Sequence, residues 1–279
     1  MSVPHTGPLV ALGDEGGSQE RGHSMVREHA SLRESWPVHR RQTLHLLGGW
    51  VALTAVWIGF GKLLTGPLDG SAIVRTDRHV ANWMVAHRTP TWNHLTVFGS
   101  LLAETTTKVV VTAVLAVVML RLWKRWFEPM VLVVSLTIEA AAFIVVTTIV
   151  GRHRPDVPRL DGSPVGSSFP SGHTAAAAAY LAIAAVVFWH TGKRWARWLV
   201  AVGTGVVPVI VALARMYRGM HFLSDTIAGA LLGVGSVLLT VVVLGRSPEG
   251  SRITRRRPGH RHTIAQDNGE PPTTDRVGQ

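Results

Sequence analysis

Six long apolar runs, each close to the length needed to cross a bilayer, constrain this chain more than any other feature. A helix needs about 20 mainly apolar residues to span the hydrocarbon core, and only helices and closed barrels satisfy their backbone polar groups there. The sequence therefore predicts an all-α fold, a polytopic membrane helix bundle with six transmembrane helices. The expected spans are residues 44–65, 105–123, 129–150, 172–190, 197–215 and 222–245.

The composition agrees with a membrane protein and excludes several classes of site. Hydrophobic residues make up 47% of the 279 residues, and charged residues only 16%. The chain has no cysteine, which excludes disulfides and Cys-ligated zinc or iron–sulfur sites. We expect no metal and no cofactor. The net charge of +11 is explained by arginines that flank apolar runs, where they orient a protein in a membrane, so we expect no nucleic-acid partner.

The polar segments outside the spans include two tails. Residues 1–43 show no periodicity and no apolar stretch long enough for a signal-peptide core, and we expect a disordered tail there. Residues 246–279 are rich in arginine and then in proline and threonine, and we expect a second disordered, basic tail. The chain thus divides into a six-span domain at 44–245 and a tail on each side.

Lysine and arginine residues favour one side of the membrane. They are concentrated in both tails and in the loops at 123–128 and 190–197. In a six-span protein, both tails and these two loops lie on the same side of the membrane. Short cytoplasmic loops carry an excess of these residues. We therefore expect a multi-pass cell-membrane protein with both tails in the cytoplasm and with 66–104, 151–171 and 216–221 on the extracytoplasmic side.

The long extracytoplasmic segment 66–104 contains one amphipathic pattern. Val80, Trp83, Met84 and His87 recur at helical spacing, which predicts a helix. Two interpretations stay open for it, a helix lying in the membrane interface and an ordinary packed helix within the loop.

Polar and titratable residues cluster at the extracytoplasmic ends of the spans. The third span leads into GRHRP at 151–155, the fourth begins with PSGH at 170–173, and RMYRGMHFLSD at 215–225 joins the fifth to the sixth. Short loops between packed helices would bring these ends together. The expected pocket contains Arg154, His173, Arg215, His221 and Asp225.

Several of these residues suit a phosphate ligand. Arg154 and Arg215 each offer a fork of donors that matches phosphate oxygens and keeps its charge. Ser171 and Gly172 lie at the expected start of a helix, where free N–H groups and the helix dipole favour an anion. Arg152 is a further candidate, for which a phosphate contact and a role as interfacial anchor remain equally open.

The two histidines suit the transfer of a phosphoryl group. If the last span starts early enough, His221 and Asp225 share a helix face at i and i+4. The carboxylate could then hold one ring N–H and leave the other nitrogen free to attack. His173 comes from a different helix and is placed to protonate a leaving oxygen.

These motifs resemble those of a known family. PSGH at 170–173 and the spacing Arg215-x5-His221-x3-Asp225 are similar to the second and third signature motifs of the type 2 phosphatidic acid phosphatase (PAP2) family of membrane phosphatases, and GRHRP is similar to the end of the first. The resemblance covers residues 44–245. It implies a six-helix core that dephosphorylates lipid phosphates or diphosphates without a metal, through a phosphohistidine.

The resemblance also implies roles for single residues. His221 would be the nucleophile, Asp225 its partner and His173 the general acid. The phosphoryl group would be bound by Arg154, Arg215, Ser171 and Gly172.

One position departs from the family pattern. The first motif usually opens with a lysine seven residues before the arginine of its Arg-Pro pair, and this chain has Thr147 there. Arg152 and Lys108 are the candidates to supply the missing charge. Elsewhere, we expect Lys108 to pair with Glu104 at i and i+4, and Glu139, in the middle of a span, to form a hydrogen bond that packs helices.

The sequence thus predicts an enzyme that acts on a lipid phosphate in the bilayer, with an isoprenoid diphosphate carrier as the favoured substrate and a phosphorylated glycerolipid next. Head group, chain length and oligomeric state stay open. A transporter is disfavoured because the charges lie at one end of the spans and no internal repeat is visible. A catalytically impaired lipid-phosphate-binding or scaffold protein is the stronger alternative, because of Thr147.

Overall fold

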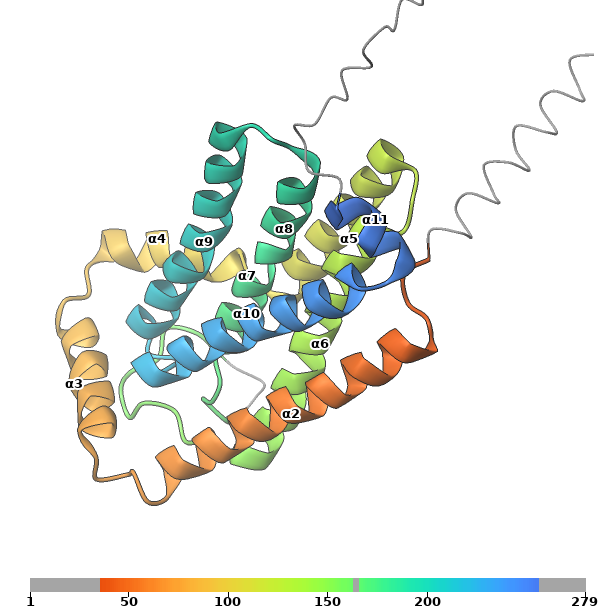
Figure 1. Cartoon of the computed structure of the whole chain (residues 1–279). Coiled ribbons are helices and arrows are strands. Elements are labelled where there is room, and N and C mark those ends of the chain that lie inside the picture. Colours follow the sequence, from red (N-terminus) through yellow and green to blue (C-terminus); the bar gives the residue numbers. More distant parts are fainter. Residues whose placement is uncertain (1–35, 163–165, 256–279) are drawn as a thin grey trace, which may run out of the picture.

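The computed structural model describes residues 36–162 and 166–255, and within them it contains helices and no strand (Figure 1). The helices are α2 (Arg40–Thr65), α3 (Ala72–Ala86), α4 (Pro90–Leu101), α5 (Thr105–Trp123), α6 (Phe127–Val150), α7 (Gly172–Ala179), α8 (Leu181–His190), α9 (Arg194–Tyr217), α10 (Leu223–Gly245) and α11 (Pro248–Arg255).

The six predicted spans are confirmed. Six helical stretches are long and apolar enough to cross a membrane, and their bounds lie within four residues of the predicted ones. The fourth span consists of α7 and α8, which meet at Tyr180. Large apolar side chains such as Val109 on α5 and Leu238 on α10 point outward, as expected where the solvent is lipid.

Small residues place α7 at the centre of the bundle, where it packs against α6, α9 and α10. The alanines at 175–179 are all at most 1% exposed. A Cβ atom on Gly229 of α10 would lie 2.3 Å from the carbonyl oxygen of Ser171, and one on Gly233 would lie 2.2 Å from that of Ala175. The backbones of α7 and α10 therefore touch, and we call this contact the glycine seam.

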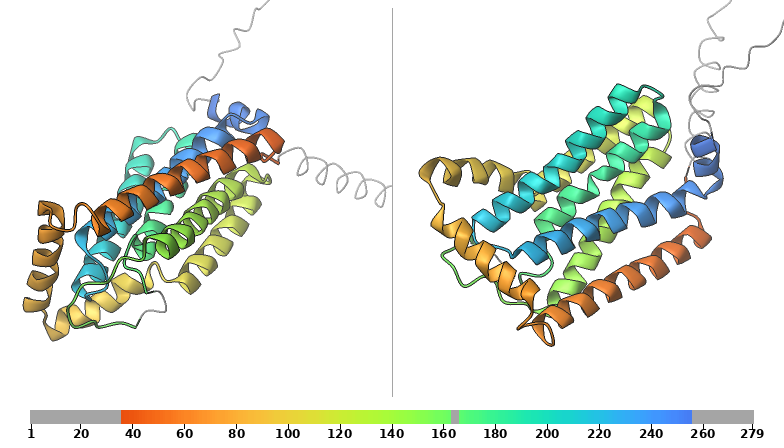
Figure 2. Two further views of the ribbon diagram at one scale, coloured as in Figure 1. Left: turned by 90° about the horizontal axis from the view of Figure 1, so that it is seen from below. Right: turned by 60° about the vertical axis from the view of Figure 1, so that its left-hand side comes forward.

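Two helices, α3 and α4, lie between the first and second spans. The helix predicted around Val80 and His87 is confirmed as α3, and α4 was not predicted, although Thr89 caps it and Pro90 opens it, both typical start signals. Figures 1 and 2 show both helices at the end of the bundle where α9 ends and α10 begins.

The predicted disorder of the C-terminal tail is wrong over residues 248–255, which form α11. Ile253 is 7% exposed and joins the main apolar core, and Gly250 lies against Phe127. Proline at the first position and glutamate in the first turn are ordinary helix-start signals. The predictions for residues 1–35 and 256–279 fall outside the described residues.

Candidate active site

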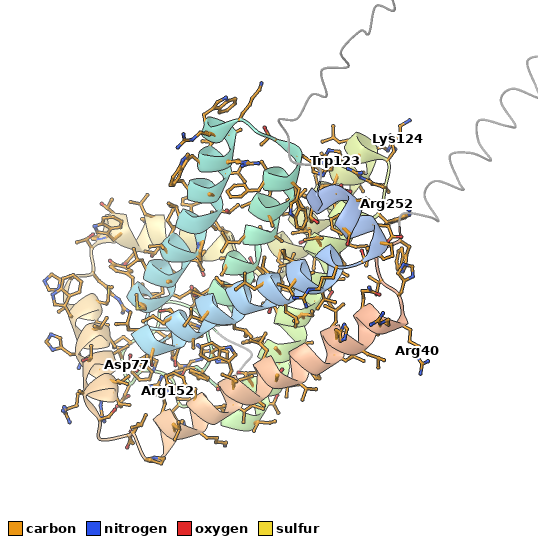
Figure 3. All side chains as sticks on the ribbon, in the orientation of Figure 1. Arg40, Asp77, Trp123, Lys124, Arg152 and Arg252 are labelled. Atoms are coloured by element: carbon orange, nitrogen blue, oxygen red, sulfur yellow. The ribbon has the colours of Figure 1, made fainter. Side chains whose placement is uncertain are left out.

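The three motif stretches lie together at one end of the bundle. The amide of Ser171 at the start of α7 donates to the Asp225 carbonyl in α10 (2.9 Å), and the amide of Ser168 donates to the Arg152 carbonyl after α6 (2.7 Å). Figure 3 shows Arg152 at the end of the molecule opposite Arg40, Lys124 and Arg252. The loop after α6, the start of α7 and the start of α10 therefore form one site.

His221 lies in the turn between α9 and α10 and is 4% exposed. Its Nδ1 lies 2.7 Å from the Ser168 carbonyl oxygen. A carbonyl only accepts, so Nδ1 carries the proton, and Nε2 is the unprotonated nitrogen of the neutral ring. Burial lowers the pKa of His221 well below 6.5, as do the nearby charges of Arg215 and Arg154, whereas the bond to Ser168 opposes this shift.

The structure corrects the expected role of Asp225. Because α10 begins at Leu223, His221 precedes the helix and shares no helix face with Asp225. The Asp225 carboxylate instead accepts from the Phe222 amide (2.8 Å) and from Arg152 Nη1 (2.5 Å). The Ser168 carbonyl holds the ring, and Asp225 fixes the backbone that carries it.

Two arginines supply fixed positive charge beside His221. Arg154 Nη1 donates to the Met220 carbonyl next to His221. Burial lowers the pKa of Arg154, and the Asp225 charge opposes that shift, but an arginine keeps its charge at neutral pH. Both charges lie close enough to affect the His221 ring, because Arg154 and Arg215 each contribute to its lowered pKa.

Arg215 is held by partners that the sequence did not predict. Its Nη1 donates to Ser100 Oγ on α4 (2.7 Å) and to Asp161 Oδ2 (3.1 Å). Asp161 also accepts from Arg218. Burial would raise the pKa of Asp161, but the Arg218 hydrogen bond and the two arginine charges outweigh it, so this pKa lies below its ordinary value.

His173 is the second residue of α7 and is partly buried. With Arg215, Asp161 and Ser100 it lines a cavity of about 390 Å³. It lies near enough to His221 for the two rings to interact electrostatically. The structure therefore brings the two predicted catalytic histidines and both predicted phosphate-binding arginines to one place.

Ser171 caps α7, as predicted: its Oγ accepts from the Thr174 amide (3.4 Å) and contacts Thr174 Oγ1 (2.9 Å). Gly172 follows as the first helical residue. A Cβ atom there would lie 2.8 Å from the Phe143 ring, so α6 also requires a glycine at this position. Ser171 Oγ takes up the Thr174 amide, and the N–H groups of Gly172 and His173 precede the first intrahelical bond and are directed out of the helix end.

Arg152, the further candidate for a phosphate contact, is paired with two carboxylates. It is 6% exposed, with Nη1 on Asp225 (2.5 Å) and Nη2 on Asp77 of α3 (2.8 Å). Its guanidinium group lies over the Phe222 ring, 4.4 Å from the centroid. Figure 3 shows Asp77 and Arg152 side by side.

The other candidate for the missing charge is also engaged. Lys108 pairs with Glu139 (3.3 Å), so the predicted pair with Glu104 is wrong and the predicted helix-packing role of Glu139 is confirmed.

Thr147 is 7% exposed, and within the described residues its Oγ1 has no hydrogen-bond partner. The same part of the chain holds no group of three His, Asp or Glu residues able to bind a metal.

Comparison with known proteins agrees with this site. Residues 128–248 match the PAP2 superfamily. Phosphatidylglycerophosphatase B of Bacillus subtilis is 36% identical over 90 residues, which are 30% of this chain and 41% of that protein. The undecaprenyl-diphosphatase of Sulfolobus acidocaldarius is 33% identical over 89 residues, 32% of this chain and 39% of that protein. The matches thus span about two-fifths of these relatives.

A solved structure extends the similarity over most of the fold. The transmembrane PAP2-type phosphatidylglycerolphosphate phosphatase from Bacillus subtilis superimposes with a TM-score of 0.61 and 25% identity, covering 73% of this chain and 98% of that one. All three motif stretches lie inside the matched residues 128–248. The resemblance predicted from these motifs is therefore confirmed: residues 128–248 match the PAP2 superfamily, and the fold is similar to that of a PAP2-type phosphatase.

Proposed function

We propose that this protein is an integral membrane phosphatase that hydrolyses a lipid phosphate or diphosphate without a metal, through a phosphohistidine on His221. One observation carries the proposal. The Ser168 carbonyl fixes the proton on Nδ1 of a buried imidazole, which leaves Nε2 as a nucleophile beside the charges of Arg154 and Arg215. This arrangement matches what an attack on a phosphoryl group requires.

The other residues have complementary roles in the proposed reaction. Arg154, Arg215 and the free N–H groups at the start of α7 bind the phosphoryl oxygens. Nε2 of His221 forms a bond to phosphorus while the bond from phosphorus to the leaving oxygen breaks. This oxygen is the lipid oxygen of a monophosphate or the bridging oxygen of a diphosphate, and protonated His173 gives its proton to it. Neutral His173 then takes a proton from water, which attacks the phosphohistidine and releases inorganic phosphate. Asp225 keeps the backbone of His221 in place.

The substrate is proposed from the position of the site and from the relatives. The motifs lie at the ends of membrane-spanning helices, where a lipid head group would be. One relative is named for undecaprenyl diphosphate and another for phosphatidylglycerophosphate. An isoprenoid diphosphate carrier is the favoured substrate, and a phosphorylated glycerolipid comes next.

A catalytically impaired protein that binds lipid phosphates remains the second candidate. One observation favours it: both residues that could replace the missing lysine are already paired with carboxylates. Lys108 binds Glu139, and Arg152 binds two carboxylates. Thr147 itself adds no charge. The remaining cage has two arginines and a helix start.

The experiment is phosphate release by purified protein in detergent with EDTA, from undecaprenyl diphosphate and from phosphatidylglycerophosphate. We expect the wild type to release phosphate and to form an acid-labile phosphoprotein from ³²P-labelled substrate, and His221→Ala to do neither while remaining folded. His79→Ala, an exposed histidine on α3, is the matched control and should behave as wild type. Near-normal turnover by His221→Ala would disprove the mechanism, and binding of vanadate without turnover by the wild type would favour the second candidate.

A further inference from the structure

The helix α3 contributes a buried carboxylate that no motif predicts. Asp77 is 1% exposed and lies outside the residues 128–248 that match the superfamily. Its Oδ1 accepts from the Ser224 amide (2.9 Å), and its Oδ2 accepts from Ser224 Oγ (2.5 Å) and Arg152 Nη2 (2.8 Å). Asp77 thus receives three donors, and Ser224, which supplies two of them, lies three residues after His221.

Arg152 connects this carboxylate to His221 by two routes. Its side chain binds Asp225, which accepts from the amide of Phe222, the residue after His221. Its main-chain carbonyl accepts from the Ser168 amide, and the Ser168 carbonyl accepts from Nδ1 of the His221 ring. A closed ring of hydrogen bonds therefore holds both the backbone and the imidazole of His221.

Asp77 balances the charge of this ring. Arg152 lies between two buried carboxylates and has almost no access to solvent. Without the Asp77 charge, the guanidinium group would keep one anionic partner. An asparagine oxygen could still accept from the Ser224 amide, but its NH2 group would then face Arg152 Nη2, a second donor. Buried groups that lose a partner cost free energy and shift to find another. Asp77 and Arg152 contact Ser224, Asp225 and Phe222, so the loss falls on the turn that carries His221.

From this geometry we infer that Asp77 is a positioning residue for His221, acting through Arg152 and Ser224, and that α3 is therefore part of the active site. This inference rests on the proposed function. Asp77 does not line the cavity that contains His173 and Arg215, so it should affect the attack by His221 and not the binding of phosphate. A misplacement of about 1 Å can lower a rate by about 100-fold.

The test is Asp77→Asn, which keeps the shape and removes the charge. We measure the rate of phosphoprotein formation in a single turnover and divide it by the amount of protein that can be phosphorylated at all. We expect this rate to fall by about 10- to 100-fold. The inhibition constant of inorganic phosphate should stay within about twofold, because the arginine cage is intact. Glu249→Gln makes the same acid-to-amide change on α11, where Glu249 contacts His39, and this variant should match the wild type in both measurements.

Expressing the rate per phosphorylatable site separates positioning from loss of folded protein. An unchanged rate per site in Asp77→Asn, or a phosphate inhibition constant that rises in parallel with the loss of rate, would overturn the inference. Ser224→Ala provides a second variant in case Asp77→Asn does not fold: it removes one contact to Asp77 and one to Arg152 and should slow the same step by a smaller factor. A wild-type rate in Ser224→Ala would also count against the inference.

The two proposals fail in different ways. If the wild type forms no phosphoprotein, the proposed function is wrong. If the wild type forms it, His221→Ala does not, and Asp77→Asn forms it at the wild-type rate, only the role of Asp77 is wrong.

Discussion

At the scale of single residues, burial, nearby charges and one hydrogen bond determine the protonation of His221. Burial and the charges of Arg215 and Arg154 disfavour the imidazolium, and the hydrogen bond to the Ser168 carbonyl supports it. The balance lowers the pKa of His221 well below 6.5. The ring is therefore neutral, as a nucleophile must be, across the physiological range.

This leads to a prediction about pH. Attack needs the neutral ring, and a lowered pKa preserves the neutral form as the pH falls. We expect the acid limb of phosphoprotein formation that belongs to His221 to lie below pH 6.5. Single-turnover rates of the wild type between pH 4.5 and 8 would measure it, after correction for the ionisation of the substrate phosphate. An acid limb at or above pH 6.5 would contradict the prediction, because it would mean that burial and the arginine charges do not lower the pKa of His221 in the working enzyme.

The position of a single residue in the site could be predicted where the residue belongs to a sequence motif. It could not be predicted where the residue comes from a distant part of the chain. The motif spacing identified His173, His221 and Arg215. It could not identify Asp77, which reaches the site from 147 positions before Ser224. The available signal was a carboxylate at helical spacing with Val74 and Ala81, on the buried face of α3.

At the scale of elements, the spans were predictable because their length and apolar composition are fixed by the bilayer. The start of α10 was not predicted closely enough. A difference of one residue, from 222 to Leu223, together with the turn that precedes it, decides whether His221 and Asp225 share a helix face. Helix α11 was missed because its short, polar sequence buries little more than Ile253.

The glycine seam gives a prediction at this scale. In Gly229→Ala, the added methyl group would overlap the Ser171 carbonyl, and forcing α7 from α10 should cost about 1–3 kcal/mol of stability. Because His173 lies on α7 and His221 precedes α10, turnover should fall by at least about 10-fold. Thermal unfolding in detergent and steady-state rates would check both effects.

The matched control for this prediction is Gly203→Ala on α9. An added methyl group there meets nothing within 4 Å, so it should leave turnover unchanged and raise helix stability by up to about 1 kcal/mol. Equal effects of the two substitutions would mean that helix propensity, and not the seam, determines the result.

At the scale of the whole molecule, the candidate site and the basic residues Arg40, Lys124 and Arg252 lie at opposite ends. Figure 3 places Asp77 and Arg152 at one end, and Arg40, Lys124 and Arg252 at the other. Arginine and lysine accumulate on the cytoplasmic side of short-loop membrane proteins. The candidate site should therefore face the extracytoplasmic side.

Labelling in whole cells would test this orientation. The chain has no cysteine, so a single introduced thiol reports without background. Arg159→Cys, at an exposed position in the loop after α6, should react with an impermeant thiol reagent, and Arg252→Cys, exposed on α11, should react only after the cells are opened. The reverse pattern would place the candidate site in the cytoplasm.

The glycine seam also limits how this fold can diverge. Where two helix backbones touch, no side chain can be lengthened or shortened to adjust the gap, so the spacing between the two histidines cannot be altered by gradual substitution along α7 and α10. Changes that adapt such a protein to a different head group must therefore accumulate elsewhere, in α3, α4 and the loop after α6, which surround the site without setting that spacing. In a comparison of relatives, we expect the seam to stay constant in size while these surrounding segments vary.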